Sequence, residues 1–159
     1  MKINAFNETK FEIDKRIISK IETLFNNLKL SDFSSERKNR ISPLLRPNTT
    51  CNLILYDKRN ITNLNKKLFK RKSPTDVISL NNPDYSHNKI FMGDIYICPQ
   101  VVKENAKKFN TDNKEELIRI IIHGILHLSG FDHKKSFDQT NEKMFKIQEI
   151  LVSKIINND

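Results

Sequence analysis

The chain has 159 residues, 37% hydrophobic and 30% charged, and Lys and Arg exceed Asp and Glu by 28 to 19, a net charge of +9. This length supports an ordinary core without disulfides, so we expect one domain over residues 1–159. The positive charge favours a polyanionic partner such as nucleic acid. The sequence shows no apolar signal segment and no stretch of membrane-span length, so we expect a cytoplasmic protein with no membrane partner.

The first part of the chain predicts two helices and one strand. Apolar residues at three- and four-residue spacings indicate an amphipathic helix over about residues 10–29. Residues 31–48, with two prolines and a basic cluster, are typical of a long loop. An alternating apolar run predicts a strand over residues 50–56, and residues 61–69 predict a short helix that ends in a basic tract.

The middle of the chain predicts two neighbouring strands. Residues 75–80 follow a proline and form the second strand, and the polar residues 81–88 turn the chain. Residues 90–98 form the third strand, which we expect to pair antiparallel with the second. Cys51 and Cys98 lie in separate strand-like runs, so we expect reduced core thiols rather than a disulfide.

The last part of the chain is predicted to be helical. Helices are expected over about residues 99–109, with Pro99 in the first turn, over residues 114–128, and from about Asp138 toward the C-terminus. Helices outnumber strands and no regular βαβ alternation occurs. The predicted fold class is therefore α+β, with a small mixed β-sheet of about four strands covered by about five helices.

Three of the four histidines lie in one short segment, HGILHLSGFDH, which begins at His123. Residues four apart on a helix project side by side, so His123 and His127 are expected to face the same space. Gly130 suits the left-handed position just past the helix end, and the reversal would bring His133 toward the other two. The fourth histidine, His87, lies in the polar turn and is expected to be exposed.

This pattern predicts a metal site. Three neutral nitrogen ligands leave one position of a tetrahedral zinc ion open, which is typical of catalytic sites, and hydrolysis is the expected chemistry. Asp132 could hold a ligand's second nitrogen or the turn itself. In the alternative interpretation, His123 and His127 are core-edge residues satisfied by hydrogen bonds, and His133 is a surface residue. Gly124 stands where H-E-x-x-H peptidases carry their general base, which disfavours a peptidase.

The same segment resembles the signature of the YbeY family of bacterial metal-dependent endoribonucleases. PTDVISL (residues 74–80) and MGDIYICP (residues 92–99) resemble two further family segments in the same order, and Leu64-Asn65 precedes them. The resemblance covers about residues 50–135. It implies a helix-covered mixed sheet of the zinc-hydrolase-like type and one zinc ion per chain. The ligands that it implies are His123, His127 and His133.

The resemblance also implies a function. It implies a single-strand-specific endoribonuclease that acts in ribosomal RNA maturation, including 16S rRNA 3′-end processing, and in ribosome quality control, with the small ribosomal subunit as a partner. The family carries an arginine five residues before the proline of the P-T-D segment, where this chain has Phe69. Lys70 and Arg71 follow directly, and a small shift of the helix end would let Arg71 act beside the three histidines as a catalytic residue.

The tract around Phe69 is a candidate RNA-binding segment. Its five cations are Lys66, Lys67, Lys70, Arg71 and Lys72. They are predicted to contact phosphates, and an exposed Phe69 would stack on a base. In the alternative interpretation the tract is a solvated helix end with Phe69 in the core. Thr75 and Asp76 are expected to pin the turn that follows.

Two other functions stay open. A ribosome-associated binding factor with structural zinc would contact RNA without cutting it, and Phe69 in place of the family arginine favours this alternative. A metal-dependent hydrolase of peptides or of another small substrate is disfavoured by Gly124 and by the positive charge.

Overall fold

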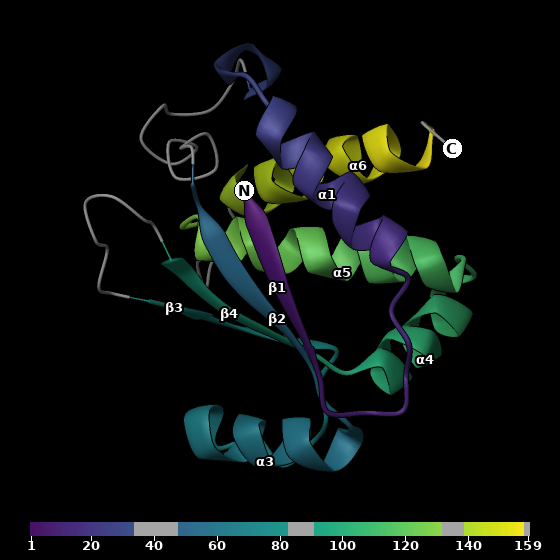
Figure 1. Cartoon of the computed structure of the whole chain (residues 1–159). Coiled ribbons are helices and arrows are strands. Elements are labelled where there is room, and N and C mark those ends of the chain that lie inside the picture. The colour runs from purple at the N-terminus through teal and green to yellow at the C-terminus, as the bar shows by residue number, and fades with distance from the viewer. Residues whose placement is uncertain (34–47, 83–90, 132–138, 158–159) are drawn as a thin grey trace.

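The computed structural model describes residues 1–33, 48–82, 91–131 and 139–157. The elements in chain order are β1 (Lys2–Asn7), α1 (Lys15–Asn27), the 3-10 helix η1 (Leu30–Phe33), β2 (Thr50–Leu55), α3 (Lys58–Phe69), β3 (Val77–Asn81), β4 (Phe91–Ile97), α4 (Pro99–Phe109), α5 (Asn113–Leu128) and α6 (Gln139–Ile156) (Figure 1). This is the predicted α+β fold. No helix in the described part of the chain is both long enough and apolar enough to cross a membrane.

The described strands form one mixed sheet in the order β1-β2-β4-β3. β1 pairs with β2 and β2 with β4 in parallel, whereas β3 runs antiparallel to β4. The predicted antiparallel pair is therefore confirmed. β1 is the strand that the sequence pattern did not locate. Of its described side chains only Ile3 is buried, so the strand lacks the alternation that marks a half-buried edge.

Helices cover both faces of the sheet (Figure 1). α1, α5 and α6 lie on one face, where residues such as Ile21, Ile95 and Ile121 form the main core with no exposed surface. α3 lies on the opposite face over a smaller cluster that contains Ile61 and Ile78. Burial of these apolar side chains is the main favourable term in folding, and it holds the helices against the two faces of the sheet.

Side-chain caps explain where two helices differ from the predicted bounds. α1 begins at Lys15 rather than near residue 10, because the Asp14 carboxylate accepts the Arg16 N–H at 2.9 Å and ends the extended segment before it. α3 begins three residues earlier than predicted, where Asp57 accepts the Asn60 N–H at 2.7 Å. The start of the predicted loop forms η1. Residues 34–47 of that loop lie outside the described residues.

The two cysteines are buried free thiols, as predicted. Burial is the main cause that raises the pKa of Cys51 to about 12. Burial also raises the pKa of Cys98, which lies at the end of β4 under α3. Both thiols therefore stay protonated and act as core side chains.

Candidate metal and RNA-cleavage site

Helix α5 carries two of the predicted ligands against the sheet. Its first turn is capped by Asp112, whose carboxylate accepts the N–H groups of Lys114 at 2.8 Å and Glu115 at 3.2 Å. Near its other end, a Cβ atom on Gly124 would lie only 2.7 Å from Cγ2 of Ile95 on β4. A glutamate at this position would collide with the sheet, which gives a physical reason why the H-E-x-x-H pattern is absent.

A glycine reversal ends α5, as predicted. Gly130 has a φ of +88°. The Gly130 N–H donates to the His127 carbonyl at 2.9 Å. The Phe131 N–H donates to the Leu126 carbonyl at 3.1 Å. These are the two hydrogen bonds of a Schellman motif, and the buried side chains of Leu126 and Phe131 complete it. The reversal places the Phe131 carbonyl over the last turn of α5.

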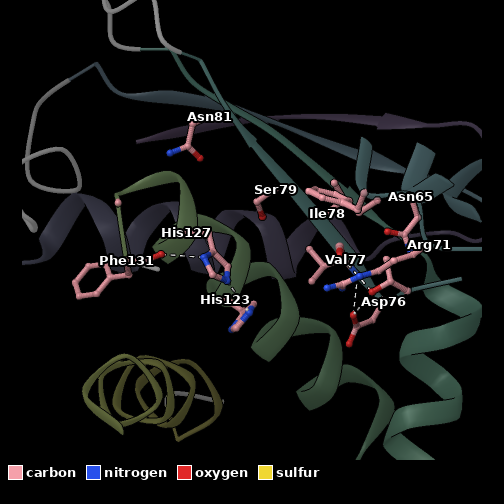
Figure 2. A pocket seen from close by; sticks show the side chains of 13 residues that line it. Asn65, Arg71, Asp76, Val77, Ile78, Ser79, Asn81, His123, His127 and Phe131 are labelled. Carbon is pink, nitrogen blue, oxygen red and sulfur yellow. Dashed lines mark hydrogen bonds between the residues drawn. The ribbon is translucent and has the colours of Figure 1, made fainter. Parts of the chain in front are cut away.

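The two imidazoles of α5 face one another (Figure 2). His123 Nε2 and His127 Nε2 are 3.1 Å apart, and the rings meet edge to face at 83°. His127 Nδ1 lies 2.8 Å from the Phe131 carbonyl oxygen, which can only accept a hydrogen bond, so this Nδ1 carries the proton. His123 Nδ1 lies 2.8 Å from the amide oxygen Oε1 of Gln148 on α6, which is likewise an acceptor.

These hydrogen bonds direct two acceptor nitrogens at one another. When Nδ1 is protonated in both rings, each neutral ring has its lone pair on Nε2, and two lone pairs 3.1 Å apart repel unless a cation lies near both. Nitrogen ligands about 2.0–2.1 Å from a tetrahedral zinc ion are separated by roughly 3.3 Å. The spacing and the donor type of His123 and His127 therefore fit a metal ion, and both rings already have the outer hydrogen bond that metal-bound histidines make.

The pair lies in a cleft of about 710 Å³. The lining residues are Asn65, Phe69, Arg71, Thr75, Asp76, Val77, Ile78, Ser79, Asn81, His123, His127, Gly130 and Phe131. One wall is α5 with its reversal, and the other is β3 with the segment after α3. In Figure 2, Phe131 and Arg71 lie on opposite sides of the histidine pair. Within the cleft, the Ser79 hydroxyl finds no hydrogen-bond partner among the residues that the structure describes.

The end of α3 places part of the basic tract in this cleft. Lys70 adopts a left-handed conformation with φ of +60°, and its N–H donates to the Lys66 carbonyl at 3.1 Å. Asn65, which is 4% exposed, donates to the Ser73 carbonyl at 2.9 Å and holds the connection that follows. Arg71 therefore lines the cleft, as does Phe69.

The predicted tract residues separate into two groups. Phe69 is 50% exposed, so the alternative that places it in the core is wrong. Arg71 is exposed and lines the cleft. The other four cations of the tract are exposed but are not among the lining residues; they are Lys66, Lys67, Lys70 and Lys72.

Asp76 has the structural role that the sequence predicts. One carboxylate oxygen accepts the Val77 N–H at 2.8 Å and the Thr75 hydroxyl at 3.1 Å. The other accepts the amide of Asn105 on α4 at 3.0 Å. These bonds tie the start of β3 to α4 and hold the wall of the cleft that faces the histidines.

Three predictions fall outside the described residues. They concern His133 as the third ligand, Asp132 as its neighbour and the exposure of His87. Among the described residues, no group of three or more His, Cys, Asp or Glu side chains is placed to hold a metal ion. The structure brings His123 and His127 together, and the assignment of all three histidines as metal ligands stays a prediction.

Gln148 and Ser79 are site residues that the sequence analysis missed. Gln148 is 3% exposed and lies between Ile147 and Leu151 on the buried side of α6. A polar residue on the buried face of an amphipathic helix is a signal that it has a specific partner. Ser79 gives no comparable signal, because serine is common at the solvent face of a strand.

Comparisons with known proteins identify the family of this chain. The family model described as endoribonuclease YbeY matches residues 4–156. Endoribonuclease YbeY of Thermotoga neapolitana is 42% identical over 111 residues, which cover 69% of this chain and 70% of the relative. Its counterpart in Petrotoga mobilis is 31% identical over 150 residues, which cover 94% and 92%.

A solved structure is also similar. The solution structure of TM1509 from Thermotoga maritima has a TM-score of 0.61 and 26% identity to this chain, and the match covers 98% of this chain and 90% of that one. The family match includes β3, β4, α5 and α6, the elements around the histidine pair. The predicted family and enzyme class are thereby confirmed: the chain belongs to the YbeY family of endoribonucleases.

Proposed function

We propose that this chain, acting as one domain, is a metal-dependent endoribonuclease that cleaves single-stranded RNA in the cleft between α5 and β3. The observation that carries the proposal is the 3.1 Å separation of His123 Nε2 and His127 Nε2 on a cleft that Arg71 also lines. A nitrogen pair and a guanidinium facing the same space suit a phosphodiester, because both favour the negative charge that develops on its oxygens.

The proposed ligands of the metal ion are His123, His127 and His133. The first two have the nitrogen type and spacing that zinc prefers. The third follows the Gly130 reversal, which turns the chain back at the end of α5. When bound, one zinc ion per chain would supply the positive charge that polarises a phosphoryl oxygen.

Other side chains of the cleft would bind and orient the RNA. The Arg71 guanidinium is permanently charged and can donate two parallel hydrogen bonds to a phosphate. Phe69 offers a half-exposed ring on which a base can stack. The attacking oxygen is either water or the RNA's own 2′-hydroxyl.

The remaining cations would extend the binding surface beyond the cleft. Lys66, Lys67, Lys70 and Lys72 lie on the exposed end of α3 and the connection after it. Each phosphate that they neutralise would release counterions and steepen the salt dependence of binding. The proposed biological substrate, by family, is ribosomal RNA on the small subunit in the cytoplasm, in 16S 3′-end processing and quality control.

The test compares wild type and a His127→Ala variant for zinc content and for cleavage of a single-stranded RNA. We expect about one zinc per wild-type chain, loss of zinc from the variant, and cleavage by the wild type alone. Equal zinc in both proteins would overturn the metal assignment. The product ends identify the nucleophile, since a cyclic or 2′/3′-phosphate excludes direct attack by water.

A second candidate is a zinc-containing ribosome assembly factor that binds RNA without cutting it. The observation in its favour is Phe69, which lines the cleft where the family has an arginine. Zinc and RNA binding without cleavage by the wild type would support this candidate. Cleavage that His127→Ala abolishes would exclude it.

A further inference from the structure

We propose that Gln148 is a positioning residue that holds His123 in the tautomer able to bind a metal ion through Nε2. The inference rests on the proposed function for the metal itself, but the hydrogen bond can be tested without metal. Gln148 belongs to α6 and His123 to α5, so the interaction joins two helices that pack against one another (Figure 1).

The orientation of the Gln148 amide determines which ring nitrogen of His123 is protonated. Its oxygen Oε1 lies 2.8 Å from His123 Nδ1, and its nitrogen Nε2 donates to Oε1 of Glu149 at 3.0 Å. A rotation of the amide by half a turn would direct its NH₂ group at Nδ1 and its oxygen at a carboxylate. Because Glu149 accepts but does not donate when ionised, it selects the orientation that makes Gln148 an acceptor for His123.

Arg119 in turn holds Glu149. Its Nε donates to one carboxylate oxygen of Glu149 at 2.9 Å and its Nη2 approaches the other at 3.2 Å. Burial opposes the ionisation of Glu149, but the hydrogen bonds and the charge of Arg119 outweigh it, so the pKa of Glu149 lies below its usual value. Glu149 therefore stays an acceptor at neutral pH.

The hydrogen bonds that link Arg119, Glu149, Gln148 and His123 begin and end on α5. Arg119 is one helical turn before His123, and between them these bonds pass through Glu149 and Gln148 on α6. Arg119 is also fixed on its own helix by Glu115 at 2.6 Å and by the buried Glu116 at 2.8 Å. The guanidinium thus has little freedom to release Glu149.

The two ligands differ in how they are oriented. His127 Nδ1 uses the Phe131 carbonyl, which no substitution removes, whereas His123 Nδ1 uses a side chain. Loss of such an outer partner costs about 10–100-fold in metal affinity. Gln148 is therefore the residue through which a substitution would change the affinity of this site without changing a ligand.

The main experiment measures zinc affinity of the full chain by competition with a chromogenic chelator. Gln148→Met keeps the length of the side chain but removes the acceptor, and we expect about 10–100-fold weaker binding. The double variant Gln148→Glu/Glu149→Gln keeps an acceptor for His123 and exchanges donor and acceptor in the 3.0 Å contact between positions 148 and 149, so it should stay within a few-fold of wild type. Ile150→Met places the same new side chain on the exposed side of α6 and serves as the matched control. Wild-type affinity in Gln148→Met would overturn the proposal.

A second readout is independent of metal and of activity. In metal-free protein, the Nδ1–H proton of His123 should give a resolved ¹⁵N-coupled signal, assigned by its loss in His123→Ala. The signal should persist in Gln148→Glu/Glu149→Gln and be lost to exchange in Gln148→Met. An unchanged signal in Gln148→Met would overturn the role of Gln148. If wild type binds no zinc but the signal depends on Gln148, the metal proposal fails and the positioning role stands.

Discussion

Gly124 on α5 packs directly against Ile95 on β4, so closely that a Cβ atom on the glycine would lie 2.7 Å from Cγ2 of the isoleucine. Ile95 has no exposed surface and cannot move aside without disturbing the core. The contact brings the helix backbone down onto the sheet between His123 and His127. It therefore sets the depth at which both rings enter the cleft.

Gly124→Ala should destabilise the protein despite the better helix propensity of alanine. Overpacking in a full core costs about 1–3 kcal/mol, and the propensity gain of about 1 kcal/mol offsets only part of it. We expect a net loss of about 1 kcal/mol in the free energy of unfolding, measured by urea denaturation. Ser153→Ala, at an exposed position of α6, should stay within about 0.5 kcal/mol of wild type. A gain in stability for Gly124→Ala would contradict the close contact.

Arg71→Ala should weaken RNA cleavage while leaving zinc content unchanged. A hydrogen bond to a charged group contributes about 1.5–3 kcal/mol, so we expect a loss of roughly 10–100-fold in kcat/KM. The slope of log affinity against log salt should fall by about one. Lys72→Ala removes a cation that does not line the cleft. The Lys72→Ala variant should show a similar change in the salt slope but cleave RNA at almost the wild-type rate. Equal losses of cleavage in Lys72→Ala and Arg71→Ala would exclude a special role for Arg71.

Arg119→Met should cost stability in a pH-dependent manner. It leaves Glu116, which is 5% exposed, without its guanidinium, and we expect a loss of about 2–3 kcal/mol near pH 7. The pKa of Glu149 is lowered in the folded wild type, so its contribution is present above pH 4.5 and is lost as the pH falls below that value. The difference between variant and wild type should therefore shrink in acid. Lys58→Met, which breaks an exposed pair with Glu104, should cost at most about 1 kcal/mol.

Cys51 should be inert toward alkylating reagents in the native protein. Burial raises its pKa from 9.0 to about 12, and the thiolate is the reactive form. A raised thiol pKa stabilises the fold below pH 9, and this contribution is lost as the pH rises from 9 toward 12. Mass spectrometry after iodoacetamide treatment near pH 8 should find Cys51 unmodified until urea is added. Rapid native labelling would show that the thiol is accessible.

The sequence predicts those features that depend on local patterns. The spacing of His123 and His127 defines one side of a helix, and Gly130 marks its end, so this part of the site is visible without coordinates. The link between His123 and Gln148 is not, because it depends on how α6 packs on α5, 25 residues away in sequence. The place of Arg71 likewise depends on the left-handed backbone of Lys70, and lysine is not a residue type that predicts this conformation.

The partner of His123 on α6 has a consequence for biosynthesis. α6 follows α5 in the chain, so a growing polypeptide presents both imidazoles before it contains Gln148. During that interval His127 already has its main-chain acceptor, whereas His123 has no amide oxygen from α6 to orient it. Orientation of His123 therefore waits for the docking of α6, and a chain without α6 would carry a histidine pair in which only His127 is oriented.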